Sequence, residues 1–281
     1  MQVLIAEHSG FCEGVERAYQ IALEQTNAGN PVFMLGNIVH NTQVVDKFIR
    51  AGAKVIKTLA EIPPNANGTL IISAHGVPPE IYTEAKAKGL GVIDTTCPWV
   101  KKAQKIAKEL AEEGRFVIIV GDNGHPEVKS LIGWSGGKAV VVEKVEDIAK
   151  LSLPPGQKIG ILAQTTQAEN TFNTIVAAVK QLEKNVKEHN TICGATAKRQ
   201  KAAVDLARKV NLILVIGDPM SANTKRLTEL CNQTGTETHQ IQTVEELDKQ
   251  WLAGKDKVGI TAGASTPEWI IKDVITRLEK L

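Results

Sequence analysis

The chain has 281 residues, with 33 lysines and arginines against 31 aspartates and glutamates, 43% hydrophobic residues and four cysteines. This composition is typical of a folded globular protein and excludes a largely disordered chain. Positive and negative residues are interspersed along the sequence, the net charge is +2, and only 4% of the residues are aromatic. We therefore expect neither a basic nucleic-acid-binding face nor a platform for stacking bases.

The sequence has no feature of a membrane or secreted protein. No apolar stretch approaches the roughly 18 residues that a membrane-spanning helix requires. The N-terminal sequence MQVLIAEH is typical of a short strand and has neither the basic start nor the small-residue cleavage site of a secretory signal. We therefore expect a cytoplasmic protein without a membrane partner. Nothing marks an oligomer interface, so we expect a monomer.

Short runs of apolar and β-branched residues recur along the chain, and each has the length of a buried strand. Helical patterns lie between them, and those from Val15 and from Val100 repeat apolar residues at i, i+3 and i+4. This alternation predicts βαβ units and an α/β fold with parallel sheets. In chain order the expected strands are Val3–Ala6, Val32–Leu35, Thr69–Ser73, Val92–Asp94, Phe116–Val120, Lys158–Leu162, Leu212–Ile216 and Lys257–Thr261.

A weak internal repeat organises the chain. A cysteine comes just before a basic helical pattern in GFCEGVERAYQIA (Cys12), TTCPWVKKAQKIA (Cys97) and TICGATAKRQKAAV (Cys193). Other predicted strands are followed by loops of small and polar residues, and a Pro-Pro-Gly stretch at 154–156 is expected to be a further loop. The repeat predicts three small α/β domains in a pseudo-threefold arrangement, with the boundaries 1–96, 97–192 and 193–281. Because ligands bind beyond the carboxyl ends of parallel strands, the loops are expected to face one chamber.

The three cysteines have the surroundings of reactive thiols. A cysteine at a helix N-terminus lies near unsatisfied N–H groups and the positive end of the helix dipole, which favours the thiolate. Three thiolates in one place would repel each other unless a metal or cluster bound them. Three ligands on a four-iron cluster would leave one iron open. A zinc site with the same thiolates, or three separately buried cysteines, are the alternatives. Cys231 lies in a helical run and is expected to pack as a small apolar residue.

The polar loops suit an anionic ligand, although neither standard nucleotide-binding signature is present. Ser221, Asn223 and Ser265 each come before or at the start of a helical pattern, where orphan N–H groups bind anions. Each could equally be an ordinary helix cap. The polar loops also hold three of the six histidines, which bind phosphate oxygens when protonated but are often only solvated: His40, His75 and His125.

Glu127 follows His125 by two residues, near the expected chamber. A carboxyl group that is shielded from water can hold a raised pKa and deliver a proton. Alternatively, Glu127 is only an acidic residue in a first helical turn, where the helix dipole favours its negative charge.

Taken together and in order, the motifs resemble those of the LytB-type 4-hydroxy-3-methylbut-2-enyl diphosphate reductases. They are GFCEGVERA, GNIVHNTQVV, SAHGVPPE, DTTCPWVKK, GHPEVKSLIGW, QTT, TICGATAKRQ, SANTKRL and TAGASTPEWII. The resemblance extends from Gly10 to the C-terminal helix and implies a trefoil of three α/β modules around one [4Fe-4S] cluster. It also implies the last step of the methylerythritol phosphate route to isoprenoids. There, two electrons and two protons remove the allylic hydroxyl of the substrate as water, giving isopentenyl and dimethylallyl diphosphate.

The resemblance implies roles for individual residues. The cluster ligands would be Cys12, Cys97 and Cys193, the catalytic residues Glu127, Thr165 and His125, and the substrate-binding residues His40, His75, His125, Thr165, Ser221, Asn223 and Ser265. A ferredoxin or flavodoxin would supply the electrons. The chain departs from the family pattern at Asn37, Gly194, Ala222 and the DPM of GDPMSAN. These departures leave two alternatives: a relative that uses the same chamber on another small hydroxylated or unsaturated ligand, and a non-catalytic phosphate-binding or zinc-structured module.

Overall fold

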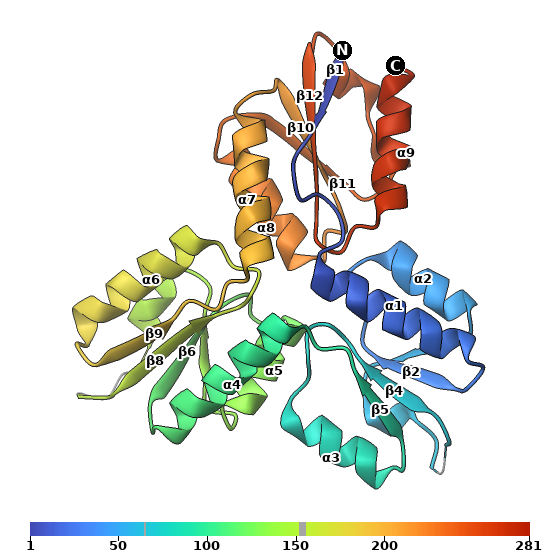
Figure 1. Ribbon diagram of the computed structural model, residues 1–281. Helices are drawn as coiled ribbons and strands as arrows, with labels where there is room; N and C mark the ends of the chain where they lie inside the picture. Colours follow the sequence, from blue (N-terminus) through green and yellow to red (C-terminus); the bar gives the residue numbers. More distant parts are fainter. Residues whose placement is uncertain (65, 152–155) are drawn as a thin grey trace. The chain divides into compact units, whose positions relative to one another are not determined.

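The computed structural model describes residues 1–64, 66–151 and 156–281. Pro154 and Pro155 of the expected loop lie outside the described residues. The described chain forms three four-stranded sheets, here called A, B and C, in which every paired strand runs parallel to its neighbour (Figure 1). The predicted α/β class with parallel sheets is therefore confirmed. Among the described helices, none is both long enough and apolar enough to span a membrane.

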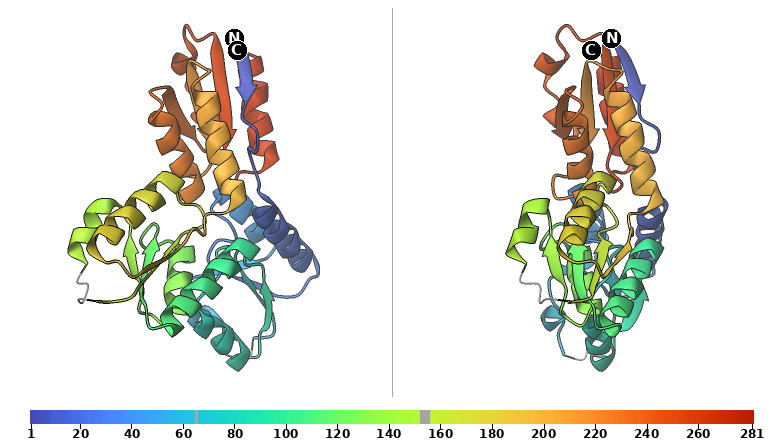
Figure 2. Two further views of the ribbon diagram at one scale, coloured as in Figure 1. Left: turned by 60° about the vertical axis from the view of Figure 1, so that its left-hand side comes forward. Right: turned by 90° about the vertical axis from the view of Figure 1, so that its left-hand side faces the viewer.

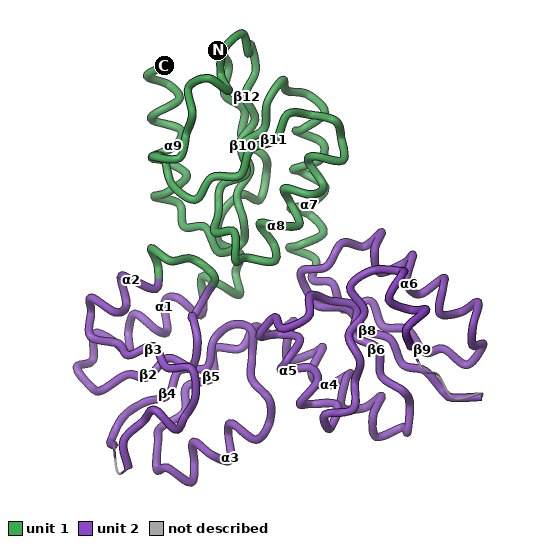
Figure 3. Tube along the Cα trace, turned by 180° about the vertical axis from the view of Figure 1, so that it is seen from behind, with its two compact units in different colours: residues 1–16, 40–44, 194–281 green, residues 17–39, 45–193 purple. Residues whose placement is uncertain are grey.

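The chain divides into two compact units, each built from several stretches of sequence (Figure 3). Unit 1 consists of Met1–Glu16, His40–Val44 and Gly194–Leu281, and unit 2 of Arg17–Val39 and Val45–Cys193. Sheet A lies in unit 1, and sheets B and C lie in unit 2. Both ends of the chain lie in unit 1, at the start of β1 and at the end of α9 (Figure 2).

Sheet A has the strand order β1-β12-β10-β11. Its strands are β1 (Gln2–Ile5), β12 (Lys257–Ala262), β10 (Leu212–Ile216) and β11 (Glu237–Ile241). Alternate residues of β10 point to opposite faces, as the period of two in a strand requires. Ile213 packs with α7 (Gly194–Ala207) and α8 (Ala222–Asn232), whereas Leu214 packs with α9 (Glu268–Glu279).

The first strand of the chain does not join the sheet formed by the rest of residues 1–96. β1 pairs with β12, with Val3 opposite Val258. The physical reason is that β1 closes both hydrophobic layers of sheet A: Val3 packs with the α9 side and Leu4 with the α7 and α8 side. Sheet A therefore combines β1, from the N-terminal part of the chain, with three strands from its C-terminal part.

Sheet B has the order β3-β2-β4-β5 and lies wholly within residues 32–94. Its strands are β2 (Val32–Leu35), β3 (Lys54–Ile56), β4 (Thr69–Ile72) and β5 (Gly91–Asp94). Phe33 and Leu70 pack with the 3₁₀ helix η1 (Leu59–Glu61) and with Ala85 of α3 (Pro79–Ala87). Helices α1 (Glu13–Asn27) and α2 (Thr42–Arg50) contact each other through the rings of Tyr19 and Phe48, whose centroids are 5.4 Å apart.

Sheet C has the order β7-β6-β8-β9. Its strands are β6 (Phe116–Val120), β7 (Val140–Val142), β8 (Ile159–Ala163) and β9 (Val186–His189). Helix α6 (Glu169–Leu182) covers one face, while α4 (Pro98–Glu112) and α5 (Pro126–Trp134) cover the other. Leu110 of α4 lies so close to β8 that a Cβ atom on Gly160 would come within 2.8 Å of its side chain, so a larger residue there would force Leu110 to move.

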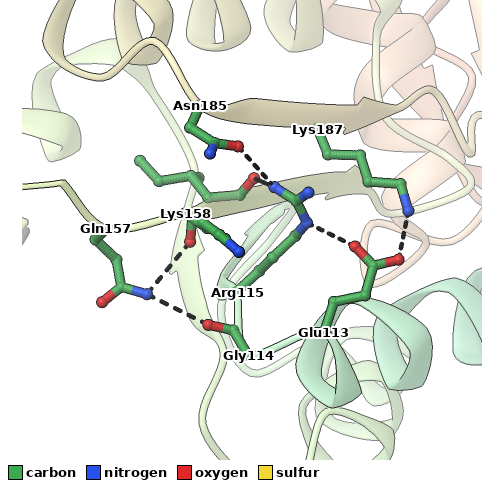
Figure 4. A network of polar contacts seen from close by, with 8 residues as sticks. Glu113, Gly114, Arg115, Gln157, Lys158, Asn185 and Lys187 are labelled. Carbon is green, nitrogen blue, oxygen red and sulfur yellow. Dashed lines mark hydrogen bonds and ion pairs between the residues drawn. The ribbon is translucent and has the colours of Figure 1, made fainter.

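Polar contacts occupy the amino ends of the strands of sheet C (Figure 4). The guanidinium of Arg115, just before β6, donates to Glu113 Oε2 at 2.7 Å and to the carbonyl of Ile159 at 3.2 Å. Lys187 of β9 forms an ion pair with the same Glu113. This exposed network is at the end of the sheet opposite to the polar loops, so it has no part in a site at the carboxyl ends.

The three sheets share one strand plan, which is the structural form of the internal repeat. The strand that leads to a cysteine is at one edge of each sheet, and the next two strands inward carry the polar loops. From this edge inward, the equivalent strands are β1, β12 and β10 in sheet A, β5, β4 and β2 in sheet B, and β9, β8 and β6 in sheet C. Each of the three cysteines is followed at once by a helix, α1, α4 or α7.

Candidate active site

The backbone of each predicted cysteine ligand is fixed to the polar loop that follows the neighbouring strand. In every case the cysteine N–H donates to a carbonyl of that loop. The pairs are Cys12 with Ala264 at 3.3 Å, Cys97 with Ala74 at 3.0 Å and Cys193 with Thr165 at 3.0 Å. Each cysteine is therefore placed beside a predicted substrate-binding residue, namely Ser265, His75 or Thr165.

The chemistry of these thiols fits an iron–sulfur cluster. Cys12, Cys97 and Cys193 are partly exposed and form no disulfide, and each lies immediately before a helix. Thiolates at such positions are the ligands that iron–sulfur clusters use. Cys231 differs: it is fully buried in the core between α8 and sheet A, and burial raises the pKa of its thiol to about 12. The prediction that Cys231 packs as a small apolar residue is confirmed.

In unit 2, a buried carboxyl group lies next to one of these cysteines. Glu127, in the first turn of α5, is only 2% exposed. Its Oε1 accepts the backbone N–H of Thr165 at 2.6 Å, and its Oε2 accepts the Thr165 hydroxyl at 2.8 Å. The carbonyl of the same Thr165 accepts the N–H of Cys193. A single threonine thus joins the carboxyl group to the backbone of a predicted ligand.

The environment of Glu127 changes its acidity. Burial raises the pKa of Glu127 from its ordinary value of 4.5 to about 7, although the two hydrogen bonds from Thr165 act in the opposite direction. An acid with a pKa near the working pH is the most effective proton donor, because it is both protonated and able to release its proton. The helix dipole alone would lower the pKa. This environment therefore favours the proton-donor interpretation of Glu127.

The raised pKa predicts a pH-dependent loss of stability. The folded protein holds a proton on Glu127 that the unfolded chain has lost, so the stabilisation is complete below about pH 4.5 and disappears as the pH rises through about 7. By linkage the loss is on the order of 3 kcal/mol. We expect Glu127→Gln, which cannot ionise, to become progressively more stable than the wild type between about pH 5 and pH 8. Denaturant unfolding across this range measures the difference, and a constant difference would contradict the assigned acidity.

Two predicted histidines lie together in unit 2. The rings of His75 and His125 meet edge to face, with centroids 5.4 Å apart and planes at 88°. His125 caps α5, and its Nδ1 accepts the N–H of Glu127 at 3.1 Å. In the neutral ring the proton is therefore on Nε2, which makes that atom a donor. Ser73 Oγ lies 3.2 Å from Nδ1 of His75. The pair is suited to donate hydrogen bonds to an anion.

In unit 1, two predicted serines are joined by a hydrogen bond between their hydroxyls. Ser265 Oγ donates to Ser221 Oγ at 3.2 Å, and both side chains are buried. Ser221 also caps α8 by accepting the N–H of Thr224 at 3.3 Å. Asn223, in the first turn of α8, is 3% exposed, and neither polar atom of its amide has a partner among the described residues. Buried polar atoms without a partner are costly, so this amide indicates a ligand.

Sequence reasoning missed two residues that organise these loops. Asp218, near His40 in unit 1, opposes the lowering of the His40 pKa that burial causes. Gln164 is fully buried: its Oε1 accepts the N–H of Asp122 at 2.8 Å and its Nε2 donates to Thr166 at 2.9 Å. Gln164 begins the QTT motif, so its position was a usable signal. Apart from its own neighbours in α7, nothing described lies within 4 Å of the place that a Cβ atom of residue 194 would occupy, so there is open space beside Gly194.

The family model of the LytB protein matches residues 3–279 of the chain. The chain belongs to the LytB family. Two relatives of this LytB protein, both named 4-hydroxy-3-methylbut-2-enyl diphosphate reductase, are similar over its whole length. The protein of Geobacter metallireducens is 44% identical over 281 residues, which is 100% of this chain and 98% of the relative. The protein of Pelobacter propionicus is 43% identical, covering 100% of this chain and 99% of the relative.

Solved structures agree with this membership. The E-1-hydroxy-2-methyl-but-2-enyl-4-diphosphate reductase of Plasmodium falciparum matches with a TM-score of 0.93 and 32% identity, covering 99% of this chain and 87% of that chain. A solved (E)-4-hydroxy-3-methyl-but-2-enyl diphosphate reductase, described as the terminal enzyme of the non-mevalonate pathway, matches with a TM-score of 0.71 and 41% identity over all of both chains. The predicted family of this LytB protein is therefore confirmed.

Proposed function

We propose that this LytB protein is an iron–sulfur reductase that converts (E)-4-hydroxy-3-methylbut-2-enyl diphosphate to isopentenyl and dimethylallyl diphosphate, the last step of the methylerythritol phosphate route. The observation that carries the proposal is the buried carboxyl of Glu127, held through both oxygens by Thr165, whose carbonyl binds the N–H of Cys193. The names of the full-length relatives support the same reaction.

The proposed cofactor is one [4Fe-4S] cluster per chain with Cys12, Cys97 and Cys193 as its thiolate ligands. When bound, the cluster supplies electrons and an iron atom that acts as a Lewis acid toward the substrate hydroxyl. The partly exposed thiols at the start of three helices support this ligand set. A ferredoxin or flavodoxin is the proposed electron donor, and a cytoplasmic monomer is the proposed form of the enzyme.

The chain's own residues supply the proton transfer. Losing the allylic hydroxyl as water requires a proton on the departing oxygen. Glu127, protonated in a substantial fraction near neutral pH because burial raises its pKa to about 7, donates that proton. Thr165 fixes the direction of the carboxyl group through its N–H and its hydroxyl. Burial of both residues excludes water, which would otherwise compete for the proton.

The remaining polar residues are proposed to bind the diphosphate. An anion with several negative charges needs donors that are already in position, because they then cost no reorganisation when the ligand arrives. The donors proposed here are the imidazoles of His40, His75 and His125, the hydroxyls of Ser221 and Ser265, and the amide of Asn223. The Ser265 to Ser221 hydrogen bond and the unpartnered Asn223 amide support this assignment.

Anaerobic purification followed by a turnover assay tests the proposal. We expect a brown protein with about four iron and four sulfide per chain. It should convert the hydroxymethylbutenyl diphosphate to both products when a chemical reductant is supplied. Zinc in place of iron would favour the zinc-structured module, and a cluster-loaded protein that leaves this substrate untouched would favour a relative with another ligand. Either result would overturn the proposed function.

A further inference from the structure

One carboxylate in unit 1 joins three separate segments of the chain. Asp218, two residues after β10, is 5% exposed. Its Oδ2 accepts the backbone N–H of Thr42 at 3.1 Å, the Thr42 hydroxyl at 2.9 Å and the amide Nε2 of Gln242 at 3.0 Å. Its Oδ1 accepts the N–H of Met220 at 2.8 Å. Both oxygens are therefore engaged, and one buried charge is balanced by four donors.

Two of the three segments that Asp218 joins carry anion-binding candidates. Thr42 comes two residues after His40, and the loop of Asp218 continues directly into Ser221 and Asn223. The carbonyl of Asp218 also accepts the N–H of Ser221 at 3.0 Å, which closes a turn at the start of that loop. The side chain of Gln242 reinforces the junction because its Nε2 also donates to the Thr42 hydroxyl, at 3.1 Å.

Two buried amide side chains flank this junction, and each has at least one polar atom without a partner among the described residues. Asn41 is 1% exposed; its Oδ1 accepts the N–H of Val44 at 3.1 Å, but its Nδ2 has no partner among the described residues. Neither Nδ2 nor Oδ1 of Asn223 has a partner among the described residues. Residues on both sides of Asp218 thus hold buried polar atoms whose cost a bound ligand would offset.

We propose that Asp218 is a positioning residue for substrate binding: through Thr42 and Gln242 it fixes the His40–Thr42 segment to the loop of Ser221 and Asn223, so that both segments bind the diphosphate together. The inference rests on the proposed function for the identity of the ligand. A carboxylate would by itself repel a diphosphate. Here both of its oxygens are engaged by four hydrogen bonds, and its charge partly offsets the lowering of the His40 pKa that burial causes.

The test compares two single variants and their combination in the cluster-loaded enzyme. Asp218→Asn keeps the size of the side chain but must turn an NH₂ group toward one of its donors, and Thr42→Val removes only the hydroxyl. We expect Asp218→Asn to raise KM and the Kd for inorganic pyrophosphate about tenfold, the effect of one lost charge-assisted hydrogen bond. The value of kcat should change less than about twofold, because Asp218 takes no part in the proposed proton transfer.

The combination separates a positioning role from other roles. If Asp218 acts through Thr42, the double variant should bind pyrophosphate no more weakly than Asp218→Asn alone, since both changes break the same junction. Thr42→Ser, which keeps the hydroxyl, should bind as the wild type does. The matched control is Asp205→Asn, on the exposed side of α7, where the aspartate pairs with Lys201. It should leave both KM and Kd unchanged.

Several results would overturn the proposal. Unchanged or tighter pyrophosphate binding in Asp218→Asn would show that the carboxylate only repels the anion or plays no part. Independent, additive effects of the two changes would also refute the role of Thr42. If Asp218→Asn proves unstable, Thr42→Val and its serine control decide the question alone. Pyrophosphate binding can be measured without turnover. A protein that shows these binding effects but has no activity would therefore refute the proposed function and support the positioning role of Asp218. If the wild-type protein does not bind pyrophosphate, the proposed positioning role of Asp218 is wrong.

Discussion

Glu127→Gln lowers kcat by about 10²- to 10⁴-fold, which is the usual contribution of a positioned general acid. The glutamine has nearly the same shape and can still accept one hydrogen bond from Thr165, but it cannot release a proton to the departing oxygen. We expect the cluster content and the Kd for pyrophosphate to stay close to the wild-type values, because the carboxyl group is proposed to contact neither iron nor diphosphate.

The chain offers a matched control for this change. Glu169 also lies in the first turn of a helix, α6, but its side chain is exposed. Glu169→Gln should leave kcat unchanged. Steady-state kinetics of the three proteins with a chemical reductant measure the effect. Normal turnover by Glu127→Gln would remove this residue from the mechanism, and an equal loss in Glu169→Gln would show that the effect is one of helix stability.

Serine in place of Cys193 removes the cluster and with it all activity. The serine hydroxyl is a weak ligand for iron compared with a thiolate, since soft sulfur ligands are those that iron–sulfur clusters select. We expect the iron content to fall from about four atoms per chain to nearly none, with loss of the visible absorbance of the cluster. The same result is expected for Cys12 and Cys97.

Cys231→Ser is the control for ligand loss. Cys231 is as much a cysteine as the others, but it is buried between α8 and sheet A, and burial raises the pKa of its thiol to about 12, so it is held as a neutral thiol. Its replacement should reduce thermal stability, because it buries a hydroxyl in an apolar core. The iron content should remain that of the wild type. Equal loss of iron in the Cys193 and Cys231 variants would show that the ligand assignment is wrong.

The sequence predicted all six inner strands of the described sheets and missed four strands that lie at sheet edges. β3 and β7 have only three residues each, too few to show a pattern. β9 reads Val-Lys-Glu-His and β11 reads Glu-Thr-His-Gln-Ile, which are polar because an edge strand is partly exposed. The edge strands β1 and β5 were found because their residues are mainly apolar. Periodicity alone therefore identifies the inner strands better than the outer ones.

The candidate site was predictable as residue types but not as pairs. Glu127 and Thr165 were both singled out, yet their double hydrogen bond joins residues 38 positions apart, which no local pattern encodes. The sequence marks Asp218 only as part of the unusual DPM in GDPMSAN and assigns it no role. Its partner Thr42 is 176 positions away, and only the folded chain brings the two together. The pseudo-threefold arrangement of three domains and the shared ligand set remain predictions.

The pairing of β1 with β12 has a consequence for the order of assembly during synthesis. β1 is synthesised well before its neighbour in the sheet, which among the described strands is β12 alone, residues 257–262. All strands of sheets B and C are synthesised before β12, so these sheets can fold while β1 is still unpaired. Cys12 is therefore synthesised before Cys97 and Cys193, but its N–H can form its hydrogen bond to the carbonyl of Ala264 only after theirs can form. Loading of iron and sulfide into the proposed cluster is expected to follow the synthesis of residues 257–264 rather than precede it.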